Sequence, residues 1–398
     1  MDMSLVADRI ALLGSESAFE VLRKAKALEA KGIDVVHLEI GQPNFGTPEH
    51  VKNKACEAIE AGDTGYTASD GELYLREAIA RHEKKYSNID AHADEVVVVP
   101  GGKPIMFFTM LSLINPGDEV IYPNPGFPIY ESCIRFAGGV PVPAPVLMHN
   151  DFKLDADVLK SLITPKTKLI IINSPGNPTG GIMEEKDIRA IADVIKDTNI
   201  FVLSDEIYSR LIYSGTKHFS MASIPEMKER TIVLNGFSKP YAMTGWRIGY
   251  GIMNKDLAKV MTLLMINSSS CVAGFTQQAA LEALEGPQDC VGEMAEAYRY
   301  RLEYFVKELN KIDGIECLMP KGSFYLFPSI KGTGLNDREF ADRLLNEAGV
   351  ACLAGSSFGR YGSGHLRLSG ATSFERLEEA IVRIKAFIEK LKAERANQ

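Results

Sequence analysis

Residues 235–250 read NGFSKPYAMTGWRIGY and directly follow the apolar run TIVL at residues 231–234. A β-branched run of this length predicts a buried strand, so we expect Lys239 at the end of that strand. Ser238 places a hydroxyl immediately before the lysine, and Arg247 follows it in the same run. An amine, a hydroxyl and a fixed cation in this arrangement can hold a cofactor that carries an aldehyde and a phosphate, which suggests pyridoxal 5'-phosphate.

Other short apolar runs predict further strands of the same sheet. They lie at residues 95–99, 119–122, 168–172, 200–203 and 248–252, and helical patterns occupy residues 105–114, 127–136 and 186–196 between them. Strands that are apolar on both faces predict a parallel or mixed sheet covered by helices. The predicted fold class is therefore α/β, with a large domain at residues 48–286.

The two ends of the chain, residues 1–47 and 287–398, predict a smaller α+β domain with an N-terminal arm. A long charged helix begins near Cys290, strand-like runs follow at residues 323–327 and 364–369, and an amphipathic helix covers residues 374–392. A helix at residues 17–32 and a strand at residues 35–40 are expected to pack with this C-terminal part.

Composition argues against several classes of partner. The 398 residues carry a net charge of -8, and lysine and arginine are scattered rather than clustered, so neither nucleic acid nor an anionic membrane is expected as a partner. The first residues lack the basic start and apolar core of a signal peptide, which predicts a cytoplasmic protein. The six cysteines form no C-x-x-C pair and have no histidines at metal-binding spacing, so we expect buried thiols and no metal site.

Polar residues follow four of the predicted strands. In chain order they are Gly101-Gly102-Lys103, then Asn177 within the segment SPGNPTG, then Asp205 and Tyr208 within SDEIY, and finally Ser238-Lys239. In open α/β sheets, ligands bind beyond the carboxyl ends of the strands. We therefore expect these groups to meet at one edge of the sheet, with the glycine pair allowing a phosphate to approach the start of a helix.

The segments NPTG, SDEIY and SKPYAMTGWRIGY, in this order and spacing, resemble the class I and II aminotransferases of fold type I, and most closely their aspartate aminotransferase-like subgroup. The resemblance covers essentially the whole chain, including IGQPNFGTP at residues 40–48, GSFY at 322–325 and LRLS at 366–369. It implies a large domain on a mostly parallel seven-stranded sheet and a smaller α+β domain. It also implies a pyridoxal phosphate-dependent enzyme that moves an amino group from an L-amino acid to a 2-keto acid by a ping-pong mechanism.

The resemblance implies a role at the cofactor for most of the residues named above. Lys239 would form the Schiff base with the cofactor and carry the proton at Cα, while Asp205 would pair with the pyridine nitrogen. Tyr208 and Asn177 would bond the phenolic oxygen, and Phe127 would stack on the ring. The phosphate would be bound by Gly101, Gly102, Lys103, Ser238 and Arg247, together with Tyr66 of a neighbouring subunit, so a homodimer is expected.

Substrate recognition follows from the same resemblance. Arg367 would grip the α-carboxylate, with Gly41, Asn177 and Phe127 alongside. Lys103 corresponds to a lysine that meets the distal carboxylate of a dicarboxylic substrate, which favours aspartate or glutamate. However, residues 104–107 read PIMF where such relatives often have QALF, and Gln42 and Asn44 replace the usual acidic residues. The side-chain specificity therefore stays open.

Simpler interpretations exist for each residue taken alone. Lys239 could be a surface lysine, Asp205 a helix cap, Phe127 a core residue, Arg367 a strand-edge cation and the glycine pair an ordinary turn. At the level of function, a lyase of the same fold that eliminates a β or γ substituent would use the same cofactor residues. A non-catalytic ligand sensor is a further alternative, and the dispersed histidines argue against metal or nucleophilic chemistry.

Overall fold

The computed structural model describes residues 6–213 and 215–396. Its largest sheet has seven strands in the order β2-β8-β7-β6-β5-β3-β4. These strands are β2 (Val96–Val99), β3 (Glu119–Asn124), β4 (Val140–Pro145), β5 (Thr167–Asn173), β6 (Phe201–Asp205), β7 (Thr231–Gly236) and β8 (Gly249–Ile252). Strands β3 to β7 pair in parallel, whereas β8 runs antiparallel to β7 and β2. The predicted α/β fold with a mostly parallel seven-stranded sheet is confirmed.

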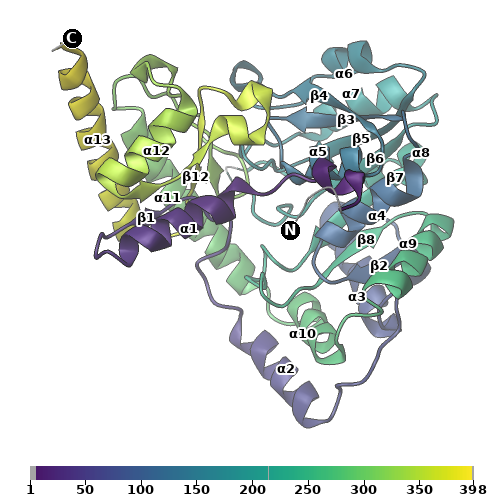
Figure 1. The fold of residues 1–398 in the computed structure, drawn as a ribbon. Helices are drawn as coiled ribbons and strands as arrows, with labels where there is room; N and C mark the ends of the chain where they lie inside the picture. The colour runs from purple at the N-terminus through teal and green to yellow at the C-terminus, as the bar shows by residue number, and fades with distance from the viewer. Residues whose placement is uncertain (1–5, 214, 397–398) are drawn as a thin grey trace.

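Helices cover both faces of this sheet, as Figure 1 shows. Along β5, Leu169 and Ile171 pack into one core with α4, α5 and α9, and Ile170 and Ile172 pack into another with α6, α7 and α8. The helices are α2 (Glu49–Glu60), α3 (Leu73–Ser87), α4 (Lys103–Leu113), α5 (Ile129–Phe136), α6 (Ala156–Leu162), α7 (Glu185–Ile195), α8 (Pro225–Lys228), α9 (Lys255–Ser268) and α10 (Gly274–Glu285). Burial on both faces explains why the strands are apolar at successive positions.

The sequence analysis missed β4, which reads VPVPAP and lies at the edge of the sheet. Proline normally argues against a strand because it has no N–H to donate. Here the prolines occupy every second position, and the N–H groups of Val140 and Val146 donate to carbonyl oxygens on the β3 side. The prolines at the alternate positions therefore face away from β3, where no ladder donor is required.

The ends of the chain form a separate group of short strands and long helices. The elements are α1 (Ser17–Glu29), β1 (Val36–His37), α11 (Asp289–Leu309), β9 (Tyr325–Leu326), α12 (Asp337–Ala348), β10 (Val350–Ala351), β11 (Leu353–Ala354), β12 (Leu366–Ser369) and α13 (Phe374–Ala396). Strand β1 pairs in parallel with β10, and β12 lies between β11 and β9. The N-terminal helix and strand thus pack with the C-terminal part, although both are shorter than predicted. The domain boundaries at residues 48 and 286 stay a prediction.

The N-terminal segment joins the two parts of the molecule. A short 3-10 helix, η2 (Asp8–Leu12), lies against α5, and the backbone N–H of Gly14 donates to the Ser132 hydroxyl on α5 at 2.9 Å. Directly afterwards α1 packs against β10 and β11. Figure 1 shows this part of the chain, in purple, crossing from the helices of the large sheet to the C-terminal elements.

The cysteines are less buried than predicted. Three are buried, but Cys56 is exposed and Cys271 and Cys290 are partly exposed. On α2 the buried positions are Val51, Ala55 and Ala58, and Cys56 lies outside that stripe. Across the described residues, none of the helices combines the length and apolar character needed to span a membrane.

Candidate active site

A cavity of about 590 Å³ opens at the carboxyl ends of β5, β6 and β7 and reaches β12. Every residue predicted for the site lines this cavity except Gly101 and Tyr66. Those that line it are Gly41, Gly102, Lys103, Phe127, Asn177, Asp205, Tyr208, Ser238, Lys239, Arg247 and Arg367. The predicted meeting of polar groups at one sheet edge is therefore present in the structure.

Lys239 lies on the wall of the cavity, three residues after β7. Its amine donates a hydrogen bond of 2.6 Å to the backbone carbonyl oxygen of Gly41. Burial lowers the pKa of Lys239 to about 8, and the nearby guanidinium of Arg367 adds to this effect. Arg247 acts in the same direction but more weakly.

Asp205 ends β6 and is almost completely buried. The hydroxyl of Tyr130 donates to Asp205 Oδ2 at 2.6 Å, and the backbone N–H of Ile207 donates to Oδ1 at 3.3 Å. Burial raises the pKa of Asp205 to about 6, although the Tyr130 hydrogen bond opposes the rise. A turn follows Asp205, so the carboxylate does not cap a helix. It is available to a cationic group that enters the cavity.

At the start of α4, Gly101 and Gly102 lie close to Arg247 at one end of the site. Gly101 has a φ of +80°, and a Cβ at this position would collide with the Arg247 guanidinium. Arg247 is fixed by hydrogen bonds to the carbonyl oxygens of Thr244 at 2.7 Å and Pro100 at 3.4 Å. The N-cap residue of α4 is Gly102, which has no side chain to cap the first N–H groups of the helix. The free helix start and the fixed cation together suit a phosphate group.

Arg367 approaches the cavity from β12 and is buried. It donates to Asn177 Oδ1 at 3.3 Å and to the backbone carbonyl oxygen of Glu39. Within the described structure its Nε has no hydrogen-bond partner. Because β12 is the middle strand of its sheet, Arg367 is not a strand-edge cation. An unpaired, buried guanidinium donor favours the binding of a carboxylate.

The comparison with known proteins decides the family. The family model described as "Aminotransferase class I and II" matches residues 33–384. The chain belongs to this family. The aspartate aminotransferase of Bacillus sp. (strain YM-2) is 41% identical over 390 residues, which cover 96% of this chain and 99% of that protein. Aromatic-amino-acid aminotransferase 2 of Thermococcus litoralis is 38% identical, with 97% of this chain and 99% of that protein covered.

Solved structures agree with the sequence comparison. The aspartate aminotransferase from Thermus thermophilus with maleate has a TM-score of 0.92 to this structure at 36% identity, covering 96% of this chain and 99% of that one. The chain is thus an aminotransferase of fold type I, as the sequence resemblance implied. Among the residues that the structure describes, no group of histidine, cysteine, aspartate or glutamate side chains is placed to hold a metal ion.

In this aminotransferase, two tyrosines share a hydrogen bond beside the lysine. The hydroxyls of Tyr208 and Tyr325 lie 3.0 Å apart, and the ring of Tyr208 lies 5.8 Å from the Lys239 amine. Burial raises the pKa of both phenols, so both stay protonated at neutral pH. The Arg367 guanidinium lies 4.5 Å from the centre of the Tyr325 ring. Tyr325 therefore supports two of the residues that the sequence analysis assigned to the site.

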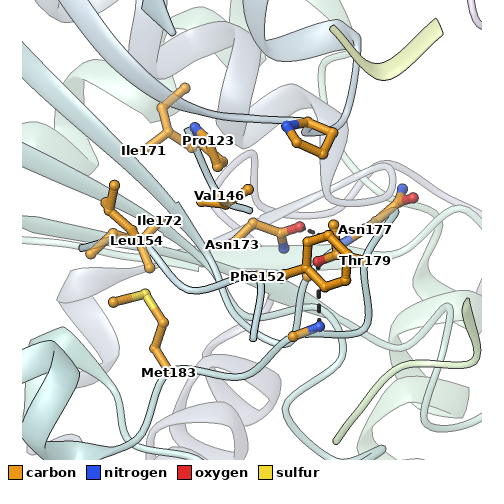
Figure 2. A pocket seen from close by; sticks show the side chains of 13 residues that line it. Pro123, Val146, Phe152, Leu154, Ile171, Ile172, Asn173, Asn177, Thr179 and Met183 are labelled. Atoms are coloured by element: carbon orange, nitrogen blue, oxygen red, sulfur yellow. Dashed lines mark hydrogen bonds between the residues drawn. The ribbon is translucent and has the colours of Figure 1, made fainter. Parts of the chain in front are cut away.

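A second, much smaller cavity of about 20 Å³ supports the loop that carries Asn177. Figure 2 shows Asn173 and Asn177 at its border, with Phe152, Val146 and other apolar side chains around it. The Asn173 side chain accepts a hydrogen bond of 2.8 Å from the backbone N–H of Asn177 and donates to the carbonyl oxygen of Asp205 at 3.1 Å. The Asn177–Pro178 bond is cis. The cavity is too small for an amino acid, and its apolar packing fixes the loop.

The aminotransferase differs in how it surrounds three further predicted site residues, which are Phe127, Lys103 and Tyr66. Phe127 precedes α5, lines the cavity and meets Tyr130 edge to face at 5.7 Å between ring centroids. Lys103 forms an ion pair with Glu16, and its amine lies 5.6 Å from the Phe127 ring. Tyr66 is 95% exposed and does not reach the cavity of its own chain.

The sequence analysis missed Tyr130 and Glu16. Tyr130 lies 75 residues before Asp205, and no local pattern links the two. Glu16 lies 87 residues before Lys103 and precedes an amphipathic helix, where an acidic residue is common in any case. Only the three-dimensional arrangement brings these residues to the site.

Proposed function

We propose that this aminotransferase uses pyridoxal 5'-phosphate and works by a ping-pong mechanism. The observation that carries the proposal is that a partly buried lysine, Lys239, shares one cavity with a buried aspartate, Asp205, and a buried arginine, Arg367. The volume of the cavity, about 590 Å³, supports the binding of a cofactor together with a small substrate. When bound, pyridoxal phosphate withdraws electrons from Cα of the amino acid, so that its proton can leave.

Each end of the cofactor has matching residues in the cavity. Arg247, Ser238 and the N–H groups of residues 101–103 at the start of α4 would bind the phosphate. Asp205 would hold the protonated ring nitrogen, since a carboxylate buried among few donors gains most from a cationic partner. Tyr208 and Asn177 would donate to the phenolic oxygen, and Phe127 would cover one face of the ring.

Lys239 has the acid–base property that the reaction needs. An ordinary lysine, with a pKa near 10.4, is protonated almost completely at neutral pH. With a pKa of about 8, Lys239 is neutral in about a tenth of molecules at pH 7, far more than an ordinary lysine, so it can accept the proton from Cα and return it. Arg367 would orient the substrate by holding its α-carboxylate through two parallel N–H donors, including the unpaired Nε.

Aspartate and glutamate are the proposed amino donors. Lys103 lines the cavity on the side of Phe127 and could meet a distal carboxylate. The Bacillus relative is named aspartate aminotransferase, and the Thermus structure is with maleate, a dicarboxylate. Both support a dicarboxylic substrate, with a 2-keto acid as the acceptor.

The proposed active unit is a cytoplasmic homodimer in which Tyr66 reaches the phosphate site of the second copy. Its near-complete exposure in the single chain supports this, as do the exposed apolar side chains of Leu73 and, on α9, Leu263 and Ile266. Light scattering on the purified protein should give twice the mass of the chain. A monomer that is fully active would contradict the proposal.

An absorbance spectrum tests the proposed chemistry. The purified protein should absorb in the visible and near-ultraviolet, and adding aspartate or glutamate alone should remove the long-wavelength band, because the first half-reaction needs no keto acid. Adding a 2-keto acid should then restore the band. A lyase would instead release ammonia continuously from the amino acid without an acceptor, and a protein that cannot be reconstituted with the cofactor would overturn the proposal.

A further inference from the structure

All but one of the charged residues that line the cavity have a role in binding the cofactor or the substrate under the proposed function. The charged residues that line it are Glu16, Lys103, Asp205, Lys239, Arg247 and Arg367. Under the proposed function, Asp205, Lys239 and Arg247 serve the cofactor, and Arg367 serves the α-carboxylate. Lys103 is the proposed partner of a distal carboxylate, so Glu16, which pairs with Lys103, is the one charged group of the lining that is left without a role.

The Glu16–Lys103 pair is an ion pair within the site, formed by two separate parts of the chain. Glu16 comes from the segment that crosses to α1, and Lys103 begins α4. Among the described residues, Glu16 is the one carboxylate within 4 Å of the Lys103 amine. The Glu16 side chain is largely buried at 20% exposure, whereas Lys103 is 53% exposed. The carboxylate therefore faces the cavity rather than bulk water.

The Glu16 side chain is not held in place by a capping hydrogen bond, although Glu16 occupies the N-cap of α1. Its negative charge instead acts on the site, because it raises the pKa of Lys239 and of Tyr325 against the influence of the neighbouring arginine. A glutamate that leaves a helix uncapped and neutralises a cavity lysine points to a role in ligand binding.

The wall around this pair is apolar. The side chains of Ala18, Phe19, Ile40, Met106 and Phe127 line the same cavity. Phe19 belongs to α1 and is 64% exposed, although it is a large apolar residue. Such a wall suits an aromatic or aliphatic substrate side chain, provided that no uncompensated charge lies beside it.

We propose that Glu16 is a specificity-determining residue that occupies, on Lys103, the place of a distal substrate carboxylate. While the pair is intact, Lys103 is neutralised and the apolar wall accepts aromatic or aliphatic amino acids. When a dicarboxylic amino acid binds, its distal carboxylate replaces the Glu16 carboxylate as the ion-pair partner of Lys103. The Glu16 side chain then rotates outward into solvent. The inference rests on the proposed function and extends it, because one pocket then serves two classes of amino acid.

The exchange is energetically feasible in both directions. A partly exposed ion pair contributes little net stability, so a substrate carboxylate can displace Glu16 at small cost. An unpaired lysine beside an apolar side chain loses water without gaining a partner, so Glu16 favours apolar substrates by keeping Lys103 paired. Removing the Glu16 charge should therefore shift preference toward dicarboxylic substrates.

The test compares Glu16→Gln with the wild type on two substrates, aspartate and phenylalanine. We expect kcat/KM to rise about threefold to tenfold for aspartate and to fall about threefold or more for phenylalanine, mainly through KM. The matched control is Glu20→Gln, which removes the same charge one turn further along α1 from an exposed residue paired with Lys24. The control should leave both values unchanged.

The same Glu16→Gln change made in a Lys103→Ala variant shows whether Glu16 acts through Lys103. In Lys103→Ala protein, the further change Glu16→Gln should alter the aspartate-to-phenylalanine ratio much less than it does when Lys103 is present, because the group that Glu16 neutralises is gone. Maleate, a dicarboxylate without an amino group, should inhibit Glu16→Gln several-fold more tightly than the wild type. This binding readout does not depend on turnover.

The outcomes separate this inference from the proposed function. If the wild type transaminates neither substrate and binds no pyridoxal phosphate, the proposed function fails. If the wild type is active but Glu16→Gln leaves both the substrate ratio and maleate inhibition unchanged, the role of Glu16 is refuted while the proposed function stands. An effect of equal size in the Lys103→Ala background would likewise refute it.

Discussion

The amine of Lys239 lies 2.6 Å from the carbonyl oxygen of Gly41 and donates a hydrogen bond to it. Lys239 follows a strand of the large sheet, whereas Gly41 follows β1 of the other part of the molecule, so this bond crosses between the two. A side chain on Gly41 would collide with the Tyr325 hydroxyl. The close approach of backbone, lysine and tyrosine therefore requires glycine at this position.

Replacing Lys239 with alanine should abolish transamination and the long-wavelength absorbance of the bound cofactor. The reason is that the other amine among the described residues of the cavity, Lys103, is 53% exposed and paired with Glu16. The loss in kcat should be about 10⁴-fold or more, measured by a coupled assay alongside the spectrum. Lys186→Ala, a change on the exposed face of α7, is the control and should retain full activity. Retained turnover in Lys239→Ala would refute the assignment.

Asp205→Asn should stabilise the cofactor-free protein while removing its activity. The folded-state pKa of Asp205 is about 6, above its ordinary value of 3.8, so the ionised carboxylate opposes folding above pH 6. As the pH falls below 6 the folded protein takes up the proton first, and the penalty disappears near pH 4. Asparagine carries no such penalty, so the free energy of unfolding at pH 8 should rise by about 1–3 kcal/mol.

Thermal melts across pH check this expectation for Asp205. The difference in Tm between Asp205→Asn and the wild type should be largest above pH 6 and should shrink as the pH approaches 4. A difference that is constant over this pH range would show that the stability change comes from packing. Activity at saturating cofactor should be lost at every pH, because asparagine cannot hold a protonated ring nitrogen by charge.

Gly101→Ala should weaken cofactor binding by about tenfold or more. The alanine Cβ would displace the Arg247 guanidinium, and the positive φ adds backbone strain. Gly62→Ala is a close control, because Gly62 has a φ of +83° and nothing within 4 Å of the added carbon. Titration of cofactor-free protein with pyridoxal phosphate should show weaker binding in Gly101→Ala alone. Equal effects in both variants would attribute the loss to strain.

Arg367→Ala and Lys103→Ala should have different substrate profiles. Arg367 would hold the α-carboxylate that every amino acid shares, so its loss should lower kcat/KM for alanine and aspartate alike, by about 10²-fold or more. Lys103 would meet only a distal carboxylate, so its loss should lower kcat/KM for aspartate and spare alanine. Steady-state kinetics on the two substrates decide the matter. An equal loss for both after Lys103→Ala would remove the argument for acidic substrates.

Most of the large sheet could be predicted because each of its strands has a recognisable pattern in the local sequence. Residues 95–99 and 168–172 are short, β-branched and apolar at successive positions, which is the pattern of strands buried on both faces. Strand β4 could not be predicted, since alternate prolines look like a loop until the edge of the sheet is known. The length of strand β1 was overestimated because Leu38 and Ile40 are apolar but lie outside the paired strand.

The site could be predicted where its residues follow strands and not where they come from distant helices. Asp205 and Lys239 each end or follow a buried strand, so chain position alone brings them to the same edge. Tyr130 reaches Asp205 from α5, and Glu16 reaches Lys103 from the N-terminal segment. These two contacts depend on how helices pack, which local sequence does not specify.

The prolines of β4 have a consequence for how copies of this chain behave when crowded together. An outer strand normally presents a row of N–H groups to which a strand from another molecule can add. On β4 the outward positions are Pro141, Pro143 and Pro145, which have no N–H to offer. This rim of the sheet is therefore closed to intermolecular strand addition, which protects the protein from growing into cross-β aggregates along that side.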